Sequence, residues 1–198
     1  MLRLVKLRIA ALALILFSGP ALAGDVNVRN CTWCHGTSAE GYASAPRLAG
    51  QREQYIYDQL VNFVTHTRDN PFSRQYMWAA VHALDPFAAR NLAHYFSTVP
   101  PEPAADGKKA LVLVGGTLYA EGSPETNLVP CAGCHGPNAE GRGVIPRLGG
   151  LSYRYLTRRL EEWAEGYHPA ARPPMPGLSN KLYPIEIDAL ASYLSFVP

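Results

Sequence analysis

The stretch CTWCHG at residues 31–36 recurs 100 positions later as CAGCHG at residues 131–136. Two thiols one helical turn apart can each form a thioether with one vinyl group of the same porphyrin. The histidine that follows can then donate a ring nitrogen to the iron, which makes Cys-x-x-Cys-His the attachment signature of c-type haem. We therefore expect two covalently bound haem c groups. The expected attachment and iron-binding residues are Cys31, Cys34, His35, Cys131, Cys134 and His135.

Other uses of four cysteines are less consistent with this spacing. A four-cysteine zinc site usually has its two Cys-x-x-Cys pairs about 15–20 residues apart, whereas these pairs are far more distant and each precedes a histidine. Disulfides are common in exported proteins, and four cysteines allow three pairings. A redox-active dithiol belongs in a thioredoxin-like strand–helix unit, of which the sequence shows no sign. Haem attachment is the interpretation that explains both histidines.

The repeat extends well beyond the cysteine motif. From residue 31 to residue 50, eleven of twenty positions are identical to those 100 further on, including Pro-Arg-Leu at 46–48 and at 146–148. Towards the end of each unit the offset becomes 98, and both units close with Val-Pro, at 99–100 and 197–198. A duplication is the simplest explanation, so two units of one fold are expected.

Helical periodicity dominates both units. Large apolar residues at 56, 60 and 63, and again at 156, 160 and 163, are spaced to share one helix face. In the last segment of the first unit Asp85 can cap a helix and Pro86 suits its first position. Since no segment alternates like a strand, we predict an all-α fold of two tandem domains, each a small helical fold around one haem. The expected divisions are a signal peptide at 1–23, a first domain at 24–99, a proline-rich linker at 100–107 and a second domain at 108–198.

The N-terminus predicts export. A basic start, an apolar run over residues 9–17 and the Ala21-Leu-Ala23 site describe a secretory signal peptide, with an uncleaved membrane anchor as the alternative. Removing residues 1–23 takes away three of the 18 Lys and Arg and none of the 16 Asp and Glu, which leaves a net charge near −1. Such a chain has no basic surface for nucleic acid. We expect a periplasmic protein and leave open a loose membrane association.

The methionines suggest the second iron ligand. Apart from Met1, the chain contains only Met77 and Met175, one in each unit, 42 and 40 residues after the motif histidine. Methionine is ordinarily a gap-filling core residue, but two at equivalent positions and none elsewhere predict iron ligands. His66 and His168 lie close enough in sequence to compete for that role. The four histidines outside the motifs, which are these two with His82 and His94, are expected mostly at the surface.

These features together resemble the class I cytochromes c, in particular the two-haem cytochrome c4 group, over nearly all of residues 25–198. The resemblance implies that the proline carbonyl of each Pro-Arg-Leu run binds the second ring nitrogen of the proximal histidine. It also implies that one arginine and one tyrosine in each unit lie near the haem propionates. These further cofactor-binding residues are Pro46, Pro146, Arg47, Arg147, Tyr55 and Tyr155.

One feature departs from the class I pattern. Such domains usually begin with a helix that packs across the last one, and residues 108–119 can form it in the second unit, with Gly115 and Gly116 allowing close approach. The first unit has only residues 24–30 before its motif, which is short for a full helix. We therefore expect the other domain or a partner protein to cover the stripe formed by Leu92, Tyr95 and Phe96.

Methionine as sixth ligand fills both axial positions of the iron, which favours electron transfer over catalysis. We expect a non-enzymatic carrier of single electrons between a donor dehydrogenase or quinol-oxidising complex and an acceptor such as a terminal oxidase. The alternatives are the cytochrome subunit of a dehydrogenase complex, such as a flavocytochrome, and a haem enzyme with a displaceable ligand. The expected partners are redox proteins, and the chain is expected as a monomer or a partner-bound subunit.

Overall fold

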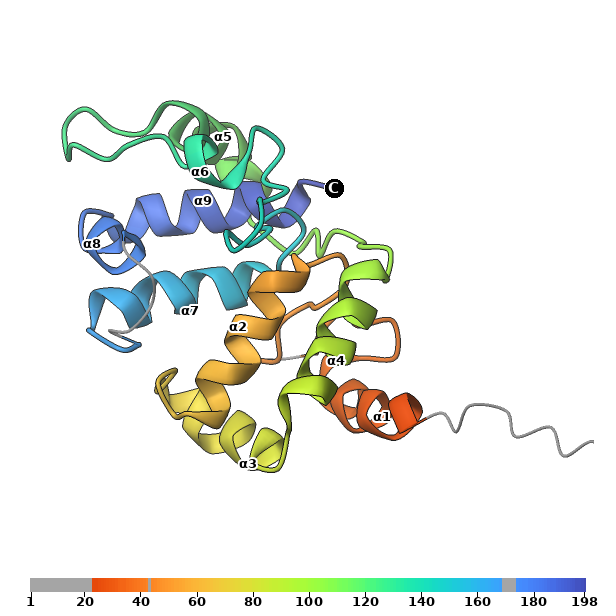
Figure 1. Ribbon diagram of the computed structural model, residues 1–198. Helices are drawn as coiled ribbons and strands as arrows, with labels where there is room; N and C mark the ends of the chain where they lie inside the picture. The colour runs from red at the N-terminus through yellow and green to blue at the C-terminus, as the bar shows by residue number, and fades with distance from the viewer. Residues whose placement is uncertain (1–22, 43, 169–173) are drawn as a thin grey trace, which may run out of the picture.

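The computed structural model describes residues 23–42, 44–168 and 174–198. Their regular structure is helical, and the only pairings of strand type in these ranges are three isolated bridges. The helices form two units that lie side by side (Figure 1). The prediction of an all-α fold with two tandem units is confirmed. The expected signal peptide lies outside the described residues except for its last position.

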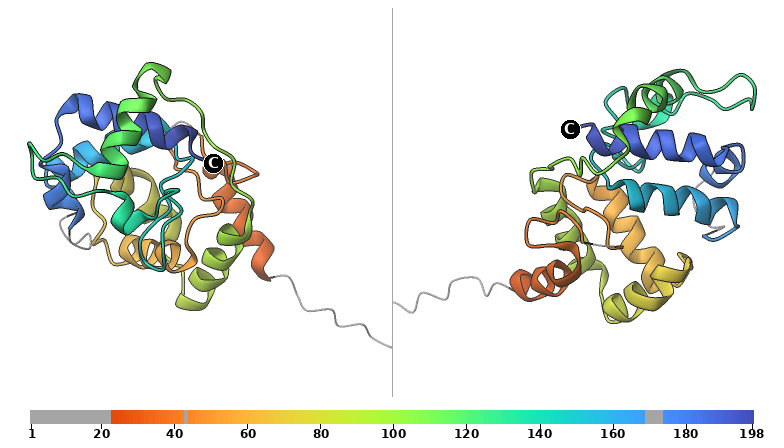
Figure 2. Two further views of the ribbon diagram at one scale, coloured as in Figure 1. Left: turned by 90° about the horizontal axis from the view of Figure 1, so that it is seen from above. Right: turned by 180° about the vertical axis from the view of Figure 1, so that it is seen from behind.

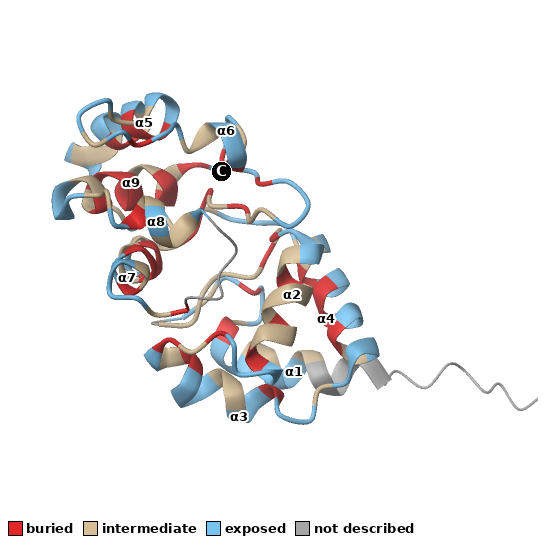
Figure 3. Ribbon diagram, turned by 60° about the vertical axis from the view of Figure 1, so that its left-hand side comes forward, coloured by how far each residue is buried: buried red, intermediate tan, exposed pale blue. Residues whose placement is uncertain are grey.

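The first unit contains α1 (Ala23–His35), α2 (Glu53–Val64), a π-helical turn (Ser73–Met77), α3 (Trp78–Val81) and α4 (Pro86–Thr98). Its core lies mainly between α2 and α4. The expected face of α2 is buried, and so is the inner face of α4 (Figure 3). The largest buried residues of this core are Ile56, Leu60, Phe63, Val81, Leu92 and Phe96.

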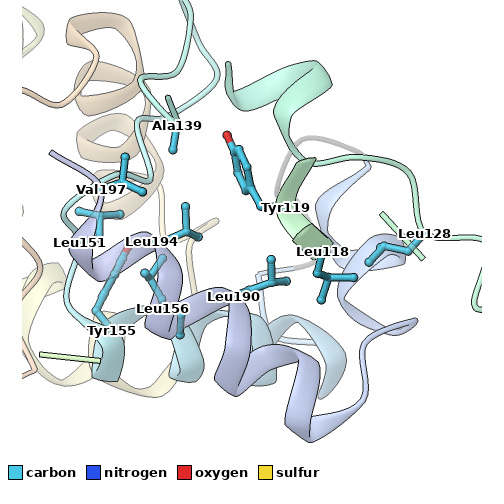
Figure 4. Packing of buried hydrophobic residues seen from close by; sticks show 11 residues of the cluster. Leu118, Tyr119, Leu128, Ala139, Leu151, Tyr155, Leu156, Leu190, Leu194 and Val197 are labelled. Carbon is cyan, nitrogen blue, oxygen red and sulfur yellow. The ribbon is translucent and has the colours of Figure 1, made fainter. Parts of the chain in front are cut away.

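The second unit contains a 3₁₀ turn (Lys109–Leu111), α5 (Val112–Glu121), α6 (Ala132–His135), α7 (Tyr153–Ala164), α8 (Met175–Ser179) and α9 (Pro184–Phe196). Its core gathers where α5, α7 and α9 meet (Figure 4). The buried residues drawn there include Leu118, Tyr119, Leu151, Leu156, Leu190 and Leu194.

The helices reproduce the two offsets of the repeat. Helix α7 begins and ends 100 residues after α2, and α9 begins and ends 98 residues after α4. The predicted cap is present, because the Asp85 carboxylate accepts a hydrogen bond from the Ala88 backbone N–H at 2.8 Å. Pro86 and Pro184 each start their helix, where a missing N–H costs nothing.

The N-terminal helices differ between the units. Helix α5 crosses α9 so closely that a Cβ on Gly115 would lie 1.9 Å from the Ala189 carbonyl oxygen, which confirms the expected role of this glycine. In the first unit α1 instead runs directly into the cysteine motif and packs beside α4 (Figure 2). The expectation that Leu92 and Phe96 need cover from outside is wrong, since both are buried in the core of their own unit. Only Tyr95 remains 40% exposed.

The proline-rich segment between the units is held by the second unit. Its backbone N–H groups at Ala104 and Ala105 donate to the carbonyl oxygens of Gly150 and Ser195, at 3.0 and 2.8 Å. The Gly107 N–H donates to the Ser195 hydroxyl at 3.0 Å, and Lys108 donates likewise to Ser192. These bonds explain why two serines of α9 are fully buried.

Among the described helices, none has the length and apolar character needed to cross a membrane.

Substitution of Gly115 by alanine tests the close crossing of α5 and α9. The new methyl group would overlap backbone, which cannot move aside as a side chain can, so we expect the free energy of unfolding of the haem-loaded protein to fall by about 2 kcal/mol. Gly116→Ala is the control, because its Cβ would meet only the Tyr193 ring at 3.2 Å, and we expect a change below about 1 kcal/mol. Urea unfolding followed by circular dichroism measures both, and equal losses would contradict this packing.

Candidate haem sites

Each unit holds its motif histidine in the same way. His35 ends α1 and His135 ends α6, and both rings are buried, 6% and 5% exposed. Nδ1 of His35 lies 2.8 Å from the Pro46 carbonyl oxygen, and Nδ1 of His135 lies 2.9 Å from that of Pro146. Because a carbonyl only accepts, Nδ1 must carry the proton, which leaves Nε2 with a free lone pair for iron. The contact implied by the family resemblance is present in both units.

Burial sets the charge state of these rings. It lowers the pKa of His35 and of His135, and the bond to the proline carbonyl offsets only part of that effect. Neutral imidazole is the form that binds a metal. The protein itself therefore holds both histidines in the neutral form, with Nε2 available to bind iron.

The loop after each histidine is a compact turn with a required glycine. Gly36 and Gly136 have φ values of +82° and +86°, and a Cβ on either would lie 2.4 Å from the carboxylate carbon of Glu40 or Glu140. These carboxylates accept hydrogen bonds from the backbone N–H two residues before them, at 2.8 and 2.9 Å. The repeated glutamates thus serve the turn that carries the chain from the histidine to the proline.

The four cysteines have a consistent arrangement, and none of them is joined in a disulfide. Cys31 and Cys131 are partly buried against the core of their unit, whereas Cys34 and Cys134 are exposed. Burial raises the pKa of Cys31, and it raises that of Cys131 to about 11. In the part of the chain that the structure describes, no group of three or more His, Cys, Asp or Glu side chains could hold a metal ion. The donor set in each unit, two thiols and one histidine with a free Nε2, fits an iron that arrives within a porphyrin.

The two methionines occupy related but different positions. Met77 ends the π-helical turn and packs partly buried against the first core, beside Trp78. Met175 is the first residue of α8 and is also partly buried. Their binding to iron stays a prediction.

The remaining histidines divide as expected, with one exception. His66, His82 and His94 are exposed, and His66 stacks on the Trp78 ring with 3.9 Å between centroids. His168 is the exception, because it is only 3% exposed. Its backbone N–H donates to Asp69 Oδ1 of the other unit at 2.7 Å, and its ring lies 3.3 Å from an Arg159 nitrogen. His168 is therefore buried because it belongs to the boundary between the units.

The four residues assigned to the propionates lie near that same boundary. Arg147 is 6% exposed, and its Nη2 has no hydrogen-bond partner. Arg47 donates to the Pro103 carbonyl at 3.2 Å but leaves its Nε unpaired. Burial and then the charge of Arg47 lower the pKa of Arg147. Two neighbouring guanidinium groups, one buried and one partly buried, with unpaired donors fit an anionic group such as a haem carboxylate.

The tyrosines are coupled to a third arginine. The Tyr155 hydroxyl accepts a hydrogen bond from Arg68 at 3.3 Å across the boundary. Burial raises the pKa of Tyr55 to about 12, with a further contribution from Tyr155. Burial also acts to raise the pKa of Tyr155, but the charges of Arg68 and Arg159 outweigh it and lower that pKa.

Sequence analysis missed the cationic cluster around these tyrosines, formed by Arg68, Arg158 and Arg159. Glu162 is their buried anionic partner, bonded to Arg159 and, at 3.2 Å, to Asn70 of the other unit. Arg68 Nε and Arg158 Nη1 remain without hydrogen-bond partners. The only sequence signal was the pair of arginines ahead of two glutamates in α7, because none of the three arginines is repeated between the units.

Comparison with known proteins places these features in one family. The model of the family described as Cytochrome c matches residues 115–197. Cytochrome c4 of Azotobacter vinelandii is 32% identical over 89% of each chain. The thiosulfate dehydrogenase electron acceptor of Stutzerimonas stutzeri is 34% identical over 84% of this chain and 78% of its own.

Two further matches differ in coverage. Cytochrome c-552 of Acidithiobacillus ferridurans is 33% identical over 69% of this chain, a stretch that spans 61% of that relative. The solved structure of cytochrome c4 from Acidithiobacillus ferrooxidans superposes with a TM-score of 0.79 at 30% identity, covering 84% of this chain and 98% of the other.

The buried His168 predicts acid sensitivity. Burial and the charges of Arg68 and Arg159 lower its pKa from 6.5 to about 3, against the opposing effect of Asp69. Between these values the unfolded chain binds a proton that the folded chain does not, so stability is lost as the pH falls through this window. From about pH 6.5 to about pH 4 we expect this group to cost about 3 kcal/mol in the free energy of unfolding.

The test compares stability against pH in the wild type and in His168→Gln, which should lose less stability on acidification. His82→Gln, at an exposed position, should follow the wild type. Parallel curves for all three proteins would show that His168 does not carry the effect.

Proposed function

Since the chain belongs to the cytochrome c4 family of class I c-type cytochromes, and carries two covalent haem c groups, we propose that it is a periplasmic electron carrier. It takes single electrons from a donor dehydrogenase or quinol-oxidising complex and gives them to an acceptor such as a terminal oxidase. Electron transfer by two haems is common to the family, and we propose the compartment and the two partners for this chain.

The single observation that carries the proposal is the matched pair of buried histidines. Each presents a free Nε2 to iron and has its ring fixed by a proline carbonyl, at 2.8 and 2.9 Å. The haems supply one-electron chemistry when bound, and the protein's part is to bind, orient and tune them. We assign Cys31, Cys34, Cys131 and Cys134 to haem attachment, and Met77 and Met175 as the further iron ligands beside the two histidines. With a histidine and a methionine both bound, the iron would have no open position for a substrate.

Two adjoining units also suit a relay. One unit can face the donor while the other faces the acceptor, and the polar boundary between them keeps the two sites in a fixed arrangement. We retain the domain divisions at 24–99, 100–107 and 108–198, although the linker packs as part of the second unit.

The cytochrome subunit of a dehydrogenase complex is a second candidate, favoured by one specific surface. In the second unit, Ala189 and Ser192 of α9 are buried where α5 and the linker cover them. The equivalent residues of α4, Asn91 and His94, are exposed. A partner protein in a stable complex would cover this face. The relative named as an electron acceptor of thiosulfate dehydrogenase supports the same alternative.

Native purification separates the two candidates. A carrier should elute as the free chain, take up two electrons per chain, and be reduced by its donor at a rate proportional to the donor concentration. A subunit should elute with a dehydrogenase in constant ratio. Carbon monoxide added to the ascorbate-reduced protein should leave the spectrum unchanged, because ready binding would require an open axial position and would support a haem enzyme instead.

Replacement of the methionines tests the axial ligands. Met77→Leu and Met175→Leu should each remove half of the far-red absorption band of methionine–iron ligation in the oxidised protein, and each should lower the reduction potential of one haem. The haem content should stay at two per chain, since the thioethers are untouched. His66→Gln is the control and should keep the full band. Loss of the band in that variant, or its retention in a methionine variant, would contradict the assignment.

A further inference from the structure

Gln51 breaks the symmetry of the repeat at the boundary between the units. The position 100 residues later is Leu151, a buried core residue. Gln51 is itself only 5% exposed, although it lies in the loop that joins the first Pro-Arg-Leu run to α2. A buried amide in place of an apolar residue costs free energy unless its polar atoms are bonded.

The Gln51 amide is bonded on both sides, and its partners are in both units. Its Nε2 donates to the Arg147 carbonyl oxygen at 2.8 Å, and its Oε1 accepts from the Arg147 backbone N–H, also at 2.8 Å. Oε1 accepts a second bond from the Arg52 N–H at 2.8 Å. Two donors on one atom and an acceptor on the other fix the orientation of the amide. A leucine at this position could make none of these bonds.

Gln51 thereby completes a path between the two motif histidines that consists of hydrogen bonds and short stretches of covalent chain. The His35 ring bonds the Pro46 carbonyl, and the backbone runs from there to Leu48, whose carbonyl accepts from the Gln51 N–H at 3.1 Å. The Gln51 side chain then bonds the Arg147 N–H. That N–H belongs to the same peptide group as the Pro146 carbonyl, which bonds the His135 ring at 2.9 Å.

We propose that Gln51 is a positioning residue that sets the second haem site from the first unit, an inference that rests on the proposed function. By bonding the Pro146–Arg147 peptide it strengthens the hydrogen bond on the His135 ring and so lowers the reduction potential of the second haem. The same bridge holds the two proximal loops in register.

The direction of the effect follows from polarisation of one peptide group. When the Arg147 N–H donates to Gln51, electron density moves toward the Pro146 oxygen, which becomes a stronger acceptor for His135 Nδ1. A more strongly bonded imidazole is a more basic ligand, and a more basic ligand favours the oxidised iron. The first unit receives no such bond from Leu151, so the effect falls on the second haem alone.

The test uses the haem-loaded full-length mature protein and a spectroscopic redox titration that resolves both haems. In Gln51→Met, which keeps the length but removes both polar atoms, we expect the ratio of reduced to oxidised second haem at a fixed potential to rise about threefold. The first haem should be unchanged. Gln51→Glu retains the acceptor for the Arg147 N–H and should stay at or below the wild-type potential. If the methionine variant fails to fold, Gln51→Glu still tests the inference, because a second-haem potential above that of the wild type would contradict it.

Asn70→Ala is the matched control. Asn70 is also neutral and buried, and it also bonds across the boundary, to Glu162 at 3.2 Å, but it touches neither proximal loop. This variant should have lower thermal stability, but the difference between the reduction potentials of the two haems should stay as in the wild type. The chemical shifts of the His135 ring protons, measured by nuclear magnetic resonance, should change in Gln51→Met and should stay unchanged in Asn70→Ala.

Two results would overturn the inference. One is an unchanged reduction potential of the second haem in Gln51→Met. The other is a change of the same size in the potentials of both haems, seen in Gln51→Met and in Asn70→Ala alike. Failure of the proposed function would be distinct, because the wild type would then lack two covalent haems or two one-electron transitions.

Discussion

The hydrogen bond between each motif histidine and the carbonyl of the proline eleven residues on is the constraint around which both units are built. It requires the chain to leave the helix, turn tightly through a glycine with positive φ, and return beneath the ring. That return places the following arginine at the boundary and starts the helix, α2 or α7, that forms one wall of the core. A small domain buries too little surface to be secure without its cofactor, so the geometry that receives iron also organises the fold.

Much of this could be predicted from the sequence, because the haem motif and the apolar faces of α2 and α7 occur once in each unit. These features, together with the Asp85 cap and the glycine crossing, depend on local sequence patterns. The boundary between the units could not be predicted, because Arg68, Asn70, Arg159 and His168 have no counterparts under either offset. The partners of Arg68, Asn70 and His168 across the boundary are 87, 92 and 99 residues away in sequence, and no periodicity indicates contacts at such a separation.

The wrong expectation about α4 has a physical explanation. Sequence reasoning assumed that an apolar stripe needs a crossing helix, as α9 receives from α5. In the first unit α2 and the extended α1 suffice to bury Leu92 and Phe96, and polar residues replace the small buried ones on the outer face, with Asn91 where the second unit has Ala189. The two copies have thus diverged at their surfaces while keeping the same interior, and this leaves them free to meet different neighbours.

The docked linker decides how this architecture can be divided or inherited. Residues 104–108 bond to Gly150, Ser192 and Ser195, and Arg47 of the first unit reaches the segment with one side chain. The seam between the modules therefore lies just before Ala104, since Pro101 lies against Gly50 and the Pro103 carbonyl accepts from Arg47, both in the first unit. A gene fusion or recombination event that transferred the second module without this segment would expose Ser192 and Ser195 of α9 to solvent. It would also remove the hydrogen bonds that the segment makes with them. The linker is part of the inheritance of the second module.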